Sequence, residues 1–144
     1  MPQRSSIEFF FQKKPVFLPK RTALKKFLSY IMTQEGRKLE TLSVVFCSDE
    51  YLLNINLDFL KHHYYTDIIS FDLSGPANPL QGEIYISVDR VSDNARTLKQ
   101  TFKSELHRVI FHGVLHFCGY GDKKPGEKKK MRAMEDFYLQ KYFK

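Results

Sequence analysis

Residues 112–122 read His-Gly-Val-Leu-His-Phe-Cys-Gly-Tyr-Gly-Asp and close the longest apolar helical run of the chain. A helix over 104–118 places His112 and His116 above one another on one face. Gly119 is predicted to end that helix with a left-handed cap, and the reversal brings Asp122 to the same point. Two imidazoles and one carboxylate can hold one Zn²⁺ ion with a fourth position open for water. The stretch therefore predicts a catalytic metal site.

A purely structural explanation of the same residues stays open. Two histidines four positions apart on an apolar helix can be packed side chains whose nitrogens are hydrogen-bonded. Gly113 stands where metalloproteases with an HExxH motif carry their general-base glutamate, so the pattern disfavours a peptidase. Cys118 is two residues beyond His116, which predicts that it points away from the site as a small buried hydrophobe.

The rest of the chain alternates between short β-prone runs and amphipathic segments. Gly36 is expected to cap the first helix, Ser48 to start the second and Asp89 to start the third. The expected strands are 7–11, 41–47, 68–73 and 83–88, and the expected helices are 20–36, 49–60, 90–99, 104–118 and 127–143. This order predicts an α+β or α/β fold in which helices cover a four-stranded sheet and the metal-bearing helix lies in the core.

Bulk properties limit the classes of protein that fit. A length of 144 residues predicts one domain over 1–144, and 42% hydrophobic residues can fill a core. The formal charge of +7 favours a polyanionic partner, with nucleic acid ahead of an acidic membrane surface. Two cysteines do not make a disulfide framework, and no apolar stretch approaches a membrane span. We expect a cytoplasmic protein.

Two segments carry the predicted RNA contacts. The loop 61–66 combines positive charge with aromatic rings, which suits stacking on unpaired bases, although a plain surface loop has the same composition. The segment 123–132 holds six cations beside the predicted ion site, where they could attract a phosphate backbone or form only a solvated face. The residues predicted to bind RNA are Lys61, His62, His63, Lys123, Lys124 and Lys128.

Three further polar residues have two interpretations each. Asp67 and Glu83 lie at the starts of strands, as solvated edge carboxylates or as groups that orient a metal-bound histidine. Asn56 lies within the second helix, either on its surface or as a polar anchor.

Three blocks of this chain resemble the YbeY family of metal-dependent endoribonucleases of bacterial ribosomal RNA maturation. HGVLHFCGYGD is similar to the family's HGxLHLxGYDH signature. Asn56 with the run TDIISF at 66–71 resembles its LN…TDVLSF, and residues 82–87 resemble its GDIxIS. The resemblance implies a zincin-like fold, a zinc ion, a ribosomal RNA precursor as substrate and small ribosomal subunit proteins as further partners, and it favours Asn56 as an anchor.

The chain departs from the family pattern at two places. When the family signature is aligned without a gap from His112, its third histidine falls on Asp122, which leaves the site a third ligand. An alignment with a one-residue gap would instead pair Asp122 with the aspartate that precedes this histidine in the signature. The arginine credited with helping RNA cleavage falls on Leu60. The resemblance therefore supports the family's metal ligands in this chain more strongly than it supports the family's catalytic residues.

Three functions from different classes remain at this point. The first is a metal-dependent endoribonuclease specific for single strands, acting in ribosomal RNA maturation, and net charge with an open metal position favours it. The second is a metal hydrolase acting on a substrate other than RNA. The third is a ribosome-assembly factor whose ion is structural.

Overall fold

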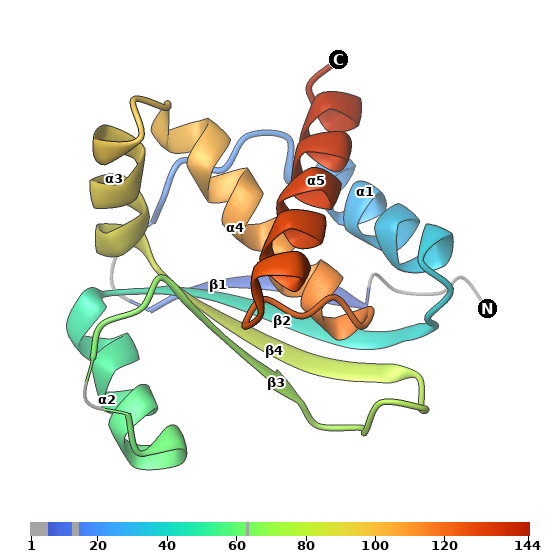
Figure 1. Ribbon diagram of the computed structural model, residues 1–144, viewed down its shortest axis with the longest axis horizontal. Coiled ribbons are helices and arrows are strands. Elements are labelled where there is room, and N and C mark those ends of the chain that lie inside the picture. Colours follow the sequence, from blue (N-terminus) through green and yellow to red (C-terminus); the bar gives the residue numbers. More distant parts are fainter. Residues whose placement is uncertain (1–5, 13–14, 63) are drawn as a thin grey trace.

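The computed structural model describes residues 6–12, 15–62 and 64–144, which form four strands and five helices (Figure 1). The prediction of a four-stranded sheet with five helices is confirmed. In chain order the elements are β1 (Ile7–Phe11), α1 (Arg21–Gln34), β2 (Leu39–Cys47), α2 (Asp49–Leu60), β3 (Ile68–Asp72), β4 (Leu80–Ser87), α3 (Val88–Thr97), α4 (Phe102–Phe117) and α5 (Pro125–Tyr142).

The sheet is mixed, with strand order β1-β2-β4-β3. β2 pairs in parallel with β1 and β4, while β3 and β4 form an antiparallel hairpin. Figure 1 shows α1, α3, α4 and α5 on one face of the sheet and α2 alone on the other. Because successive strand residues point to opposite faces, Val44, Ile84 and Ile86 face the large core, whereas Cys47 and Ile69 pack with α2.

Helix α4 is the central element of the core, as its nearly all-round apolar sequence predicts. It lies so close to the sheet that position 113 has no room for a side chain. A Cβ atom on Gly113 would lie 2.7 Å from Cδ1 of Ile84 and 2.9 Å from Cδ1 of Ile68. A larger residue at this position would therefore require the side chains of Ile84 and Ile68 to shift.

Helix boundaries follow the capping residues, with one correction. Thr101 caps α4 by accepting a hydrogen bond from the amide of Ser104, so this helix starts two residues before the predicted position. The prediction that Asp89 caps α3 is wrong, because the hydroxyl of Ser87 accepts the amide of Arg90 and Asp89 lies inside the first turn. Ser48 caps α2 as expected.

A half-buried arginine joins the end of α4 to the hairpin between β3 and β4. One terminal nitrogen of Arg37 donates to the Asp72 carboxylate at 2.8 Å and to the backbone carbonyl of Phe117 at 2.7 Å. Its other terminal nitrogen donates to the carbonyl of Gly75. Burial opposes ionisation of Asp72, but hydrogen bonds from Arg37, Ser74 and Gly75 hold the pKa of this carboxyl at about 2.

Candidate functional site

The predicted turn after α4 brings one histidine and the carboxylate together. Gly119 has a φ of +103°, and the amides of Gly119 and Tyr120 bond back to the carbonyls of His116 and Leu115. The reversed chain then places Oδ2 of Asp122 3.2 Å from Nε2 of His112. His112, His116 and Asp122 line one groove between α4 and the segment before β3.

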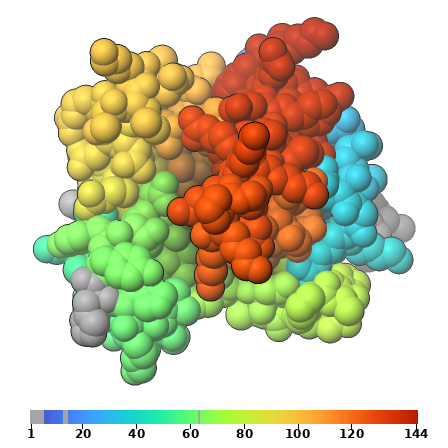
Figure 2. Space-filling model, viewed as in Figure 1, coloured from blue at the N-terminus to red at the C-terminus, as the bar shows by residue number. Residues whose placement is uncertain are grey.

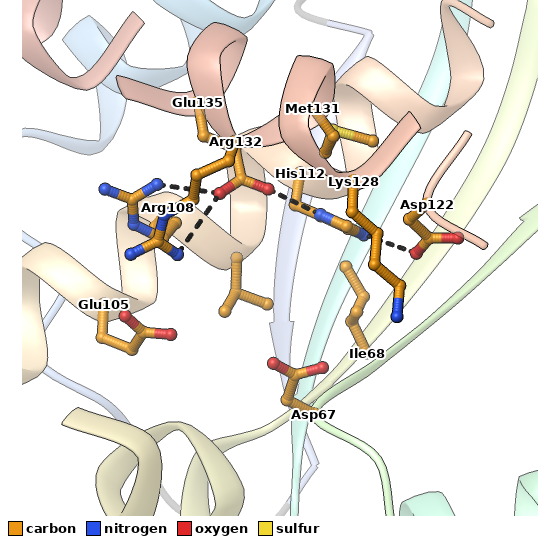
Figure 3. A pocket seen from close by; sticks show the side chains of 11 residues that line it. Asp67, Ile68, Glu105, Arg108, His112, Asp122, Lys128, Met131, Arg132 and Glu135 are labelled. Carbon is orange, nitrogen blue, oxygen red and sulfur yellow. Dashed lines mark hydrogen bonds and ion pairs between the residues drawn. The ribbon is translucent and has the colours of Figure 1, made fainter. Parts of the chain in front are cut away.

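Both histidines have their Nδ1 atoms engaged by acceptors. His112 donates from Nδ1 to Oε2 of Glu135 on α5 at 2.7 Å, and His116 donates from Nδ1 to the carbonyl of Tyr120 at 3.1 Å. This arrangement fixes the orientation of each ring and leaves Nε2 as the atom that faces a ligand. Figure 3 shows His112 held between Glu135 and Asp122.

The carboxylates around His112 set its charge. Burial disfavours the imidazolium, but the hydrogen bond and charge of Glu135, with the charges of Asp122 and Asp67, outweigh burial and raise the pKa of His112. The proton on Nε2 then bridges to Asp122. A metal ion bound at Nε2 replaces that proton, so protons and metal compete for this position.

Two of the three predicted ligands, His112 and Asp122, suit a zinc ion both in the type of donor atom and in the distance between their donor atoms. Atoms held at about 2.0–2.1 Å from a tetrahedral ion lie about 3.3 Å apart, close to the His112–Asp122 separation. His116, exposed at the groove, is the third donor but does not converge with them: the described part of the chain has no three His, Cys, Asp or Glu side chains already grouped as a metal site.

A salt-bridge cluster on α4 and α5 supports His112 from behind. Glu135, which is 5% exposed, accepts from Nη1 of Arg108 at 2.8 Å through Oε1 while Oε2 accepts from His112. Arg108 also donates to Asp136 at 2.6 Å. Glu135 therefore couples the position of the His112 ring to the packing of the two helices.

The predicted RNA-binding residues lie in three places. Lys61 caps the C-terminus of α2, and the ring of His62 stacks on Tyr64 with centroids 5.0 Å apart; His63 lies outside the described residues. Lys123 lines the groove that contains both metal-site histidines. Lys128 lines an adjoining cavity, and Lys124 forms the N-cap of α5. Figure 2 shows the first turns of α5, in orange, standing out from this face of the molecule.

The structure places the other polar residues singled out from the sequence in different environments. Asn56 is 1% exposed and donates to the carbonyl of Tyr64 at 2.8 Å, so it is an anchor. Asp67 lies in the cavity beside His112, and burial raises the pKa of its carboxyl. Glu83 accepts from Tyr85 on the sheet face opposite α4, so the interpretation that it orients a metal-bound histidine is wrong. Leu60 lines the groove at the place of the family's arginine.

Sequence reasoning missed three charged residues of the site: Glu105, Arg108 and Glu135. A signal for two of them was present. Glu105 precedes His112 by seven residues, two helical turns, and so shares its helix face. Glu135 lies between Met131 and Tyr138 on the face of α5 that was predicted to be buried. A charged residue on a buried face requires a partner, and this rule would have found both.

Comparisons with known proteins give one consistent family. The model of the family described as Endoribonuclease YbeY matches residues 11–143. A Cytophaga hutchinsonii protein named Endoribonuclease YbeY is 49% identical over 132 residues, which are 91% of this chain and 92% of the relative. A protein of the same name from Christiangramia forsetii is 42% identical over 127 residues, 88% of each chain.

A solved structure shares the fold. The solution structure of a Thermotoga maritima protein superposes with a TM-score of 0.66 at 26% identity, over 95% of this chain and 89% of that one. Among the helices of the described residues, none is both long and apolar enough to cross a bilayer.

Proposed function

The chain belongs to the YbeY family of endoribonucleases, and on this premise we propose that it cleaves single-stranded segments of ribosomal RNA precursors at a zinc site formed by His112, His116 and Asp122. The observation that carries the proposal is the contact of His112 with both Asp122 and Glu135, which presents a fixed Nε2 atom to the groove. A zinc ion there would polarise a phosphoryl oxygen and lower the pKa of a bound water.

The chain's own residues would bind and orient the RNA around that position. Lys123 at the groove and Lys128 at the adjoining cavity are placed to attract phosphates. The stacked pair His62 and Tyr64 offers a flat surface for an unpaired base. Leu60 supplies no charge where the family pattern has arginine, so in our proposal Lys123 and Lys128 supply positive charge to the reacting phosphate in its place.

The site also argues against the alternative function, a metal hydrolase that acts on a substrate other than RNA. A zincin-like arrangement of a metal-bearing helix against a sheet is part of our proposal, but Gly113 supplies no carboxylate where the peptidases carry their general base. In a cell we expect the cytoplasm as the site of action, and small ribosomal subunit proteins as partners that present the RNA.

The proposed reaction predicts turnover that depends on metal. The purified chain should contain about one zinc ion per molecule and should cut a single-stranded RNA internally, leaving a duplex of the same sequence intact. A chelator should abolish both the zinc content and the cleavage, and added Zn²⁺ should restore them. Elemental analysis and gel assays of labelled RNA measure the two quantities. Undiminished cleavage by metal-free protein would exclude the proposed chemistry.

Lysines near the site should contribute to RNA binding unequally. Lys123→Gln with Lys128→Gln should weaken binding of single-stranded RNA and reduce the slope of log K against log salt by about 0.7 for each lost phosphate contact. Lys129→Gln with Lys130→Gln is the matched control, because neither lines the groove or the cavity and Lys130 lies over the Tyr120 ring. Equal slopes for the two double variants would show that only net charge matters.

A further inference from the structure

A cavity of about 300 Å³ adjoins the candidate metal site, between α4, α5 and the segment that leads into β3. His112 and Asp122 form one side of it, so its contents lie next to the proposed scissile phosphate. Ile68, Val109 and Met131 give it apolar walls. Ligand pockets run from about 300 to 1,000 Å³, so this volume suits one flat ring system. Figure 3 shows the cavity with its lining side chains.

The carboxylate of Glu105 is the unexplained group in this cavity. Glu105 is 5% exposed, yet within the described residues it has no hydrogen-bond or ion-pair partner. The nearby guanidinium of Arg108 bonds instead to Glu135 and Asp136. Burial raises the pKa of the Glu105 carboxyl, and the smaller effects of the Arg108 and Arg132 charges, which lower it, do not offset burial. Its oxygens open onto the cavity, so hydrogen-bond donors of a ligand that enters the cavity can reach them.

We infer that this cavity is a specificity pocket for one unpaired nucleobase of the RNA, with guanine as the preferred base; the inference rests on the proposed function. Guanine presents two adjacent donors, N1–H and N2–H, which match the two oxygens of the Glu105 carboxylate. Adenine, cytosine and uracil each place an acceptor beside their donor on that edge, and this acceptor would face the carboxylate. The apolar walls contact the faces of the ring.

Charge at the entrance favours a nucleotide over a basic protein side chain. Lys128 and Arg132 lie at the rim, and Arg108 lies inside. They would repel a lysine or arginine that entered from a partner, whereas the two rim cations can bind the phosphate of a nucleotide whose base points inward. The Asp67 carboxyl, which also lines the cavity, is a second acceptor for exocyclic amino groups.

The test compares binding of 5′-GMP and 5′-UMP to the full chain by isothermal titration calorimetry. We expect GMP to bind at least about tenfold tighter, since a bidentate base contact contributes about 1–3 kcal/mol of discrimination and 1.4 kcal/mol is tenfold. Glu105→Gln and Glu105→Ala should lose most of this preference, because GMP loses the paired acceptor and the acceptor of UMP no longer faces a carboxylate. Glu40→Gln, which neutralises an exposed carboxylate away from the cavity, should keep it.

Each result decides between explanations. Equal affinities of the unaltered chain for GMP and UMP overturn the inference without any variant. Binding of a lysine-rich peptide that depends on Glu105, without nucleotide preference, overturns it in favour of a protein ligand. A mononucleotide has no phosphodiester bond for the chain to cleave, so this binding test does not depend on the proposed reaction. If the chain prefers GMP but fails to cut RNA, only the proposed reaction is refuted. Thermal unfolding of the Glu105 variants at or above the wild-type temperature confirms that they are folded.

Discussion

Replacing His112 or His116 by alanine is expected to lower zinc affinity by at least about 100-fold, because even residues that only support a ligand contribute 10–100-fold. RNA cleavage should fall with the metal content. The double variant should retain no zinc. Its fold should survive, since His116 is exposed and Glu135 keeps its ion pair with Arg108 when the imidazole is removed. Elemental analysis and circular dichroism measure the two properties.

The experiment also includes a control variant of another histidine, His62, and variants of the third proposed ligand, Asp122. His62→Ala removes an imidazole from the same groove without touching the proposed ligand set, so its zinc content should equal that of the unaltered chain. Asp122→Ala should lose affinity, whereas Asp122→His should still bind. Zinc that persists in the double histidine variant would refute the site. Full affinity of Asp122→Ala would favour the gapped alignment and direct attention to Asp67.

The largest loss of stability is expected from Glu135→Ala. This change leaves Arg108 with only its exposed partner Asp136 and frees the Nδ1 atom of His112. Removing one member of a buried pair costs about 3–5 kcal/mol of unfolding free energy, and the remaining Asp136 places the expected value near the lower end. Zinc affinity should fall by about 10–100-fold as the ring loses its orientation. Urea unfolding and zinc titration measure the two effects.

Asp136→Ala serves as the control for this prediction, because it removes a carboxylate from the same arginine at an exposed position. Its side chain is 58% exposed, and such pairs contribute about 0–1 kcal/mol. Glu135→Gln retains an acceptor of nearly the same shape and should lie between the two. Similar stabilities for Glu135→Ala and Asp136→Ala would show that the buried carboxylate does not couple the helices.

Local patterns were sufficient to predict the elements but not their arrangement. The periodic apolar residues of α1 and α4 and the alternation in β4 fix what each segment forms. Strand order depends on contacts between segments far apart, so nothing local indicates that β2 lies between β1 and β4. The cap of α3 was wrongly predicted because Ser87 and Asp89 both suit that role, and only the path of the chain out of β4 selects the serine.

In the candidate site, too, the local features could be predicted from the sequence and the long-range contacts could not. The spacing of His112 and His116 and the turn at Gly119 are local, so the approach of Asp122 to His112 could be predicted. Glu135 acts on His112 across 23 residues, and that contact exists only after α5 packs on α4. The resemblance to a family contains the same histidine pair but is silent on Glu105, whose significance depends on its burial without a partner.

The Arg37 contacts hold together segments that lie far apart in the sequence. Its bonds to Asp72 and Phe117 span 35 and 80 residues, so in the folded chain they form only after long loops have closed. Both cysteines of the chain are free, and burial raises the pKa of Cys47 to about 12, which keeps it a thiol. The arginine thus restrains distant segments without redox chemistry. Because the pKa of Asp72 is depressed to about 2, the Arg37–Asp72 part of this restraint is complete above pH of about 4 and is lost only as the pH falls toward 2.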